Sequence, residues 1–155
     1  IDRDGEPCGS GVRGCVQGYL CGPALADNYR KLQASQGLPG TSDITGEQVA
    51  HRAGAGEALA RQVLTQAGEA LGITVASMAM ILDIELFVVG GSVVKAGELL
   101  LAPARSIVPH YCFESVAAKT RIEAVALGDE SPLLGCAWLA RQTLEEQEPL
   151  ENYQR

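Results

Sequence analysis

The sequence predicts an α/β fold in which helices flank a sheet. Residues 57–146 read in turn as helix, strand, helix, strand and helix. The helical segments repeat apolar residues at three- and four-residue steps, whereas the strands show a continuous apolar run or strict alternation. The 155 residues fit one domain, and a chain of this length can bury a real core.

The first third of the chain is rich in turn and helix-start signals. Ile1–Arg3 has the pattern of a strand end, and Asp4-Gly5 that of a turn. Residues 15–22 are long enough for one or two helical turns. Pro23 suits the first position of a helix, and Gly37 suits its end.

Two further helices are predicted before the first long strand. Thr45 and Gln48 have the spacing of a capping box, so a short helix is expected there until Gly54-Ala55-Gly56 interrupts it. Glu57–Leu82 is the longest helical pattern, amphipathic in its first half and apolar nearly all round in its second. Such a helix is expected to begin at the surface and end in the core. Its apolar stretch, 70–82, falls short of the about 20 residues that span a bilayer, so no membrane contact is expected.

The last part of the chain alternates strands and helices. Phe87–Val89 is a continuous β-branched and aromatic run, which is typical of a strand covered on both faces. Arg121–Leu127 alternates as a half-buried strand does. Helices are expected over Ser92–Val108, with Pro103 as a kink or boundary, and over Leu133–Glu146. Residues 145–155 are expected to fray.

Charge and cysteine content exclude several classes of protein. The formal net charge is −7, with 12 basic against 19 acidic residues, and this argues against a nucleic-acid surface, which needs clustered Lys and Arg. The five cysteines are an odd number in a chain that can build its own core, so reduced thiols are expected rather than a disulfide framework. No export signal is visible, which favours the cytoplasm. The chain opens without Met on "IDRDGEP", and we expect a piece of a larger protein.

Two motifs carry candidate chemistry. A strand that ends in Gly90-Gly91-Ser92 at the start of a helix lets a ligand approach the backbone closely; a plain tight turn is the alternative. Cys8 and Cys15 lie on a glycine-rich loop and could bind zinc, which prefers four Cys or His ligands; inert cysteines are the alternative here. Ordinary surface roles are expected for His51, His110, Asp83 and Glu85.

Three ordered segments resemble the ROK family, a group of bacterial sugar kinases, repressors and uncharacterised proteins. The family loop, approximately dGxxCxCGxxGCxExxxSGxAL, is similar to "DGEPCGSGVRGCVQGYLCGPAL". The family segment lGxxva…lldPexivlGGg is similar to "ALGITVASMAMILDIELFVVGGS", and LGdxagllGAAxlA to "LGDESPLLGCAWLA". The likeness covers nearly the whole chain and is specific for the family, not for a substrate.

The resemblance implies roles for individual residues. Cys8 and Cys15 match two of three loop cysteines that bind structural zinc, and Ser10 stands where the third would be. A neutral hydroxyl is a poor substitute for a thiolate. Gln17 falls on the family glutamate that accepts hydrogen bonds from sugar hydroxyls, and a glutamine keeps an uncharged acceptor. Gly90, Gly91 and Ser92 match the turn that meets the adenosine side of the nucleotide.

The resemblance also implies a fold and a function. The expected fold is the C-terminal lobe of the actin-like ATPase (ribonuclease H-like) fold, over residues 1–155, with the N-terminal lobe absent. The expected function is part of an ATP- and Mg²⁺-dependent hexose or N-acetylhexosamine kinase, whose general-base aspartate and phosphate loop would precede Ile1. A homo-oligomer is implied. The alternatives are the effector-binding lobe of a ROK repressor and a degenerate interaction module, which the residues at Ser10 and Gln17 favour.

Overall fold

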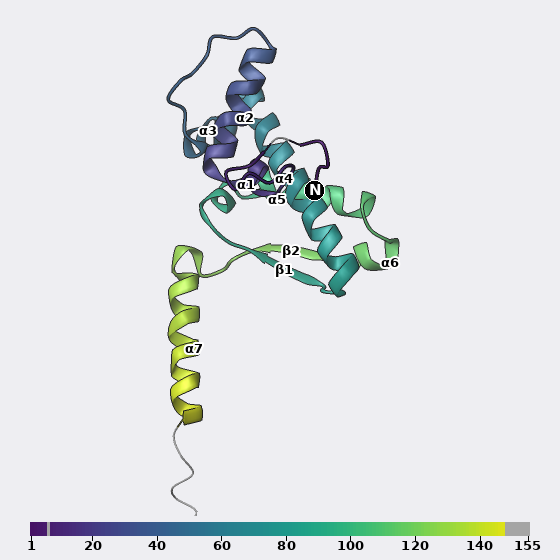
Figure 1. The fold of residues 1–155 in the computed structure, drawn as a ribbon, viewed down its shortest axis with the longest axis vertical. Helices are drawn as coiled ribbons and strands as arrows, with labels where there is room; N and C mark the ends of the chain where they lie inside the picture. Colours follow the sequence, from purple (N-terminus) through teal and green to yellow (C-terminus); the bar gives the residue numbers. More distant parts are fainter. Residues whose placement is uncertain (6, 148–155) are drawn as a thin grey trace, which may run out of the picture. The chain divides into compact units, whose positions relative to one another are not determined.

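The computed structural model describes residues 1–5 and 7–147. The chain divides after Ala124 into two compact units, the second of which begins at Val125. The first unit carries both candidate motifs. Its helices and strands follow in the order α1 (Gln17–Leu20), α2 (Gly22–Ser35), α3 (Gly46–Gly54), α4 (Ala58–Leu82), β1 (Leu86–Val89), η1 (Ser92–Ala96), α5 (Glu98–Ile107), η2 (Val108–His110), α6 (Glu114–Ala117) and β2 (Arg121–Ala124) (Figure 1).

The predicted helix boundaries of the first unit are mostly confirmed. Pro23 occupies the first turn of α2, and Gly37 follows the helix at a φ of 65°. The Thr45–Gln48 capping box is formed in both directions, with N···O distances of 3.2 and 3.0 Å. The strand end predicted over Ile1–Arg3 is wrong, since Ile1 and Asp2 belong to no regular element and a turn covers Arg3 and Asp4.

Helix α4 is the central element, and α5 packs along it (Figure 1). Two glycines of α4 permit this close approach, because a Cβ at Gly68 would lie 2.6 Å from Pro103 Cγ, and one at Gly72 would overlap the backbone at Ala104. Leu64 and Leu100 are buried in a core shared with α2 and α3, while Leu71, Val75, Leu101 and Ile122 belong to a second core beside the sheet.

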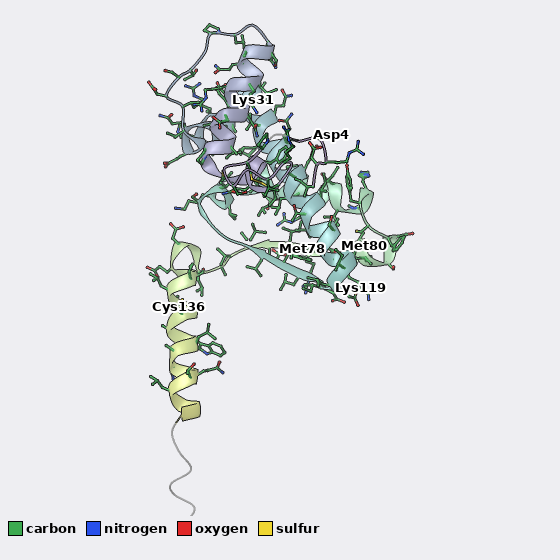
Figure 2. All side chains as sticks on the ribbon, viewed as in Figure 1. Asp4, Lys31, Met78, Met80, Lys119 and Cys136 are labelled. Atoms are coloured by element: carbon green, nitrogen blue, oxygen red, sulfur yellow. A yellow bond between two sulfur atoms is a disulfide. The ribbon has the colours of Figure 1, made fainter. Side chains whose placement is uncertain are left out.

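The far end of α4 does not reach the core, contrary to the sequence prediction. Met78, Ile81 and Leu82 are exposed, and Figure 2 labels the side chains of Met78 and Met80 near this end of the helix. Helix α4 is long and apolar enough to cross a membrane by length and composition alone. Half of its most apolar window is buried inside the protein, and the core helix of a soluble protein meets the same test.

The sheet consists of β1 and β2, which pair in parallel with Leu86 opposite Arg121 and Val89 opposite Ala124 (Figure 1). Phe87 and Val89 pack against the second core, to which Ile122 of β2 belongs. Val88 points the other way and is 59% exposed, so the predicted cover on both faces of this strand is wrong for the residues described. Strand β2 ends at Ala124, earlier than the predicted Leu127.

The helix predicted over Ser92–Val108 is divided at Gly97. This residue has a φ of 59°, in the region that favours glycine, so η1 ends there and α5 begins. Pro103 neither ends nor splits α5. Its ring lies against Gly68 instead.

The second unit contains η3 (Gly128–Glu130) and α7 (Ser131–Gln147). The helix predicted over Leu133–Glu146 is therefore confirmed and is slightly longer than expected. The tail over residues 145–155 is predicted to fray. Residues 148–155 lie outside those that the structure describes, so the prediction is not tested there.

Candidate functional site

A cleft of about 460 Å³ lies between the first residues of α2, one face of α3, and η1. Its walls are mostly apolar, and the side chains of Leu25, Ala50, Val93, Ala96 and Leu99 contribute to them. A cleft of this size, with a mainly apolar lining and few polar groups, is typical of a small-molecule site. Its polar side chains are Glu47, His51, Ser92 and Lys95.

The predicted Gly90-Gly91-Ser92 turn leads into this cleft. Gly90 follows β1 directly, and Gly91 adopts a φ of 101°, which only glycine adopts without strain. Ser92 opens η1 and lines the cleft. The predicted strand-to-helix turn is therefore formed, and the residue that follows its two glycines lines the cleft.

Helix α3 is held in place as one wall of the cleft by two contacts. Its first residue, Gly46, lies so close to α2 that a Cβ there would be 2.6 Å from Gly22 Cα. Near its end, Arg52 donates to the Tyr29 hydroxyl at 2.9 Å, and that hydroxyl donates to Glu57 at 2.5 Å. The Arg52 guanidinium also lies 5.6 Å from the centre of the Tyr29 ring.

The surroundings of the Tyr29 phenol raise its pKa above the ordinary value. Burial of the phenol, followed by its hydrogen bond to Glu57, raises the pKa of Tyr29, and Arg52 opposes this effect. The side chain is only 2% exposed. Tyr29 on α2, Arg52 on α3 and Glu57 at the start of α4 therefore join three helices through one buried hydroxyl.

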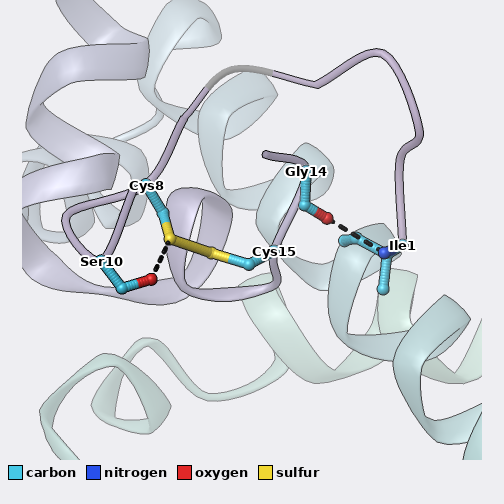
Figure 3. Close-up of a disulfide and its surroundings, with 5 residues drawn as sticks. All are labelled: Ile1, Cys8, Ser10, Gly14 and Cys15. Atoms are coloured by element: carbon cyan, nitrogen blue, oxygen red, sulfur yellow. Dashed lines mark hydrogen bonds between the residues drawn. A yellow bond between two sulfur atoms is a disulfide. The ribbon is translucent and has the colours of Figure 1, made fainter. Parts of the chain in front are cut away.

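The glycine-rich loop folds back on the first residues of the chain. The Gly14 carbonyl accepts hydrogen bonds from the amino group of Ile1 at 3.0 Å and from the Asp2 amide at 3.3 Å (Figure 3). Gly14 has a φ of 59°, and any side chain there would overlap the Asp2 carbonyl. The loop conformation thus requires glycine at this position.

Cys8 and Cys15 are joined by a disulfide, with their Cα atoms 6.4 Å apart (Figure 3). The expectation of reduced thiols is therefore wrong for this pair, because the loop turns back and brings the two sulfur atoms together. Cys21, Cys112 and Cys136 carry free thiols. The Ser10 hydroxyl lies 3.0 Å from the Cys8 sulfur, so Ser10 does occupy a position beside the predicted metal ligands (Figure 3).

The donor set at this loop does not fit a tetrahedral zinc site. Even after reduction, Cys8 and Cys15 would supply two thiolates and Ser10 a hydroxyl, where a structural site uses four Cys or His ligands. Within residues 1–5 and 7–147 there is no group of three or more His, Cys, Asp or Glu side chains that could hold a metal ion. Zinc at Cys8 and Cys15 stays a prediction.

Gln17 opens α1 directly after this loop, and its side chain is exposed. It does not line the cleft at Ser92. The fold therefore presents two separate features, the cleft and the Gln17 loop, and it does not bring all predicted site residues together.

Sequence reasoning missed one wall of the cleft. Glu47, Ala50, His51 and Gly54 all line it, and their spacing puts them on one face of α3. His51 is exposed, as expected, but it faces this cavity. The spacing in the sequence indicates that these residues share a helix face, but it does not indicate that this face borders a cleft.

The chain matches the ROK family model over residues 1–143. A glucokinase from Halalkalibacterium halodurans is 28% identical, over 92% of this chain and 45% of the relative. An N-acetylmannosamine kinase from Yersinia pestis is also 28% identical, over 92% of this chain and 45% of the relative. The chain thus spans about half the length of the curated relatives it matches.

Solved structures agree with this assignment. A ROK family glucokinase from Streptomyces griseus, solved in complex with glucose and AMPPNP, is similar at a TM-score of 0.77 and 29% identity, covering 92% of this chain and 49% of that one. A ROK family transcriptional regulator, homologous to the E. coli MLC protein, shares the fold at a TM-score of 0.67 and 22% identity, covering 80% of this chain and 32% of that one. The fold prediction is confirmed: the structural neighbours include ROK sugar kinases of the actin-like ATPase fold, and this chain is helix-rich with a small parallel sheet. The chain belongs to the ROK family.

Proposed function

We propose that this chain is the C-terminal lobe of an ATP-dependent sugar kinase, which transfers the γ-phosphoryl group of ATP to a sugar hydroxyl. The observation that carries the proposal is the cleft of about 460 Å³ that Ser92 lines, directly after the Gly90-Gly91 turn. Similar proteins also support the proposal, since one of them is a glucokinase and another is an N-acetylmannosamine kinase.

The adenosine part of ATP, carried with Mg²⁺, would enter this cleft. Leu25, Val93 and Leu99 offer an apolar lining for a flat base, while Gly90 and Gly91 leave the backbone open to close approach. Gln17 would meet a hexose or N-acetylhexosamine hydroxyl through its amide. A glutamine can both accept and donate there, although its bonds are weaker than those of a carboxylate.

Phosphoryl transfer depends mainly on positioning and on stabilisation of charge. The described residues of this chain contribute positioning: the cleft for the nucleotide and Gln17 for the sugar. The general base and the phosphate loop are expected before Ile1, so full turnover would require closure of this lobe against an N-terminal lobe. We place the protein in the cytoplasm, as a homo-oligomer.

A coupled assay of ADP release tests this function. The full polypeptide that contains these residues is supplied with MgATP and a panel of hexoses and N-acetylhexosamines. We expect ADP release that depends on one or a few of these sugars. If no sugar stimulates ADP release, the kinase proposal is wrong.

The second candidate is the effector-binding lobe of a ROK repressor. The fold shared with the transcriptional regulator favours it. In that case the polypeptide would bind sugar without ADP release and would change its affinity for DNA when sugar is added. If neither sugar nor nucleotide binds, the remaining alternative is a degenerate interaction module.

A further inference from the structure

We propose that Glu47 accepts hydrogen bonds from the ribose hydroxyls of the nucleotide, and so makes this cleft selective for ribonucleotides. The proposal rests on the proposed function, because it assigns a role within the nucleotide cleft. It begins from the cleft lining, in which Glu47 is the one acidic side chain among the described residues.

The backbone of α3 at Glu47 is held in a fixed position in the wall of the cleft. Glu47 lies in the first turn of α3, whose start is set by the capping box at Thr45 and by the contact between Gly46 and α2. Ala50 and Gly54 follow on the same face and line the cleft with little or no side chain. A planar base therefore has room along α3, beside the carboxylate.

Charge decides which part of the nucleotide Glu47 can meet. A carboxylate is an acceptor only and repels phosphate, so it can bind only neutral donor groups of ATP. Those donors are the two ribose hydroxyls and the amino group of the base. The cationic Lys95 comes from η1, a different wall of the same cleft, and Ser92 lies beside the Gly90-Gly91 turn on that wall. The phosphates are therefore expected toward Ser92 and Lys95.

The ribose is the better match of the two remaining donors. Its neighbouring hydroxyls can both donate to one carboxylate, and an acidic residue accepts a hydrogen bond from the ribose in other nucleotide-binding folds. The base is expected between apolar side chains, which Val93, Ala96 and Leu99 supply on η1 and at the start of α5. Glu47 is then a specificity residue that contacts substrate and takes no part in phosphoryl transfer.

The test is a titration of the full polypeptide that contains these residues with ATP and with 2′-deoxy-ATP, followed by calorimetry. We expect the wild-type chain to bind ATP about tenfold more tightly, the loss expected for one hydrogen bond to a charged group. In Glu47→Gln the preference should fall to about twofold or less. ATP loses the bonds from both ribose hydroxyls to the carboxylate, whereas 2′-deoxy-ATP loses only the bond from its 3′ hydroxyl, so the affinity for ATP drops more. Glu114→Gln is the matched control, since Glu114 is also an exposed glutamate in the first turn of a helix, and should keep the wild-type preference.

Each other outcome has a distinct meaning. If wild type binds both nucleotides equally, or if Glu47→Gln keeps the full preference, the role of Glu47 is wrong while the nucleotide cleft stands. If Glu47→Gln weakens ATP and 2′-deoxy-ATP equally but leaves inosine triphosphate unchanged, Glu47 contacts the base amino group and the ribose assignment is wrong. If wild type binds no nucleotide, the proposed function fails together with this inference. Circular dichroism of each variant confirms that it is folded.

Discussion

Removal of the Tyr29 hydroxyl tests whether one buried group joins the three helices around the cleft. In Tyr29→Phe the ring stays, together with its contact to the Arg52 guanidinium, but the hydrogen bonds to Arg52 and Glu57 are lost. A hydrogen bond to a charged group contributes about 1.5–3 kcal/mol. The side chains of Arg52 and Glu57 are 40% and 37% exposed, so water can replace part of the loss. We expect the free energy of unfolding to fall by about 1–2 kcal/mol.

Guanidinium denaturation followed by circular dichroism at pH 7 measures this change. Tyr111→Phe serves as the control, because Tyr111 is 53% exposed and its loss should change stability by less than about 0.5 kcal/mol. If the two variants are equally stable, the reasoning about Tyr29 is refuted.

The pKa of Tyr29 adds a second measurement. Because this pKa is raised in the folded state, the unfolded chain loses the phenolic proton first as pH rises above about 10. The unfolded state then binds fewer protons than the folded state, and stability falls with pH. The contribution is complete below about pH 10 and is lost as pH rises through the folded pKa. Tyr29→Phe should therefore lose less stability than wild type across this window.

Three further predictions concern the cleft, the proposed sugar contact at Gln17 and the glycine-rich loop. Gly46→Ala would press a methyl group against the backbone of α2. We expect the free energy of unfolding, measured by denaturation, to fall by about 1–3 kcal/mol and nucleotide binding to weaken. Gly40→Ala is the control, because a methyl group there meets open space and should change neither quantity. Gln17→Glu would supply a charged acceptor, so the KM for the sugar should fall in the coupled assay with kcat little changed; an unchanged or higher KM would argue against sugar contact at this position. The Cys8–Cys15 disulfide predicts three reactive thiols per denatured chain before reduction and five after, and five at the outset would contradict it.

Local sequence signals predicted much of the fold because they act over a few residues. The capping box at Thr45, the proline at the start of α2 and the glycine after it each specify a boundary without help from the rest of the chain. The helix break at Gly97 was harder to predict. It depends on a φ of 59°, which a glycine can adopt but need not adopt inside a helix.

Burial was harder to predict than periodicity. The continuous apolar run at Phe87–Val89 is typical of a strand with cover on both faces, yet α4 and α5 contribute to the core on only one side of β1. Val88 is 59% exposed as a result. Ile81, near the end of α4, is 80% exposed although it also belongs to an apolar run. A pattern of this kind states which side chains prefer to be buried, whereas exposure depends on which elements are present to cover them.

The cleft at Ser92 shows why a motif predicts part of a candidate site and not the whole of it. Gly90-Gly91-Ser92 is recognisable because its backbone conformation is encoded locally. The facing wall on α3 is set by two contacts distant in sequence, one between Gly46 and α2 and one through the Tyr29 hydroxyl. Neither contact leaves a periodic signal, because a close approach needs only one missing Cβ and a buried hydroxyl only one pair of partners. Specificity carried by that wall is therefore free to change between relatives while the glycine turn stays the same.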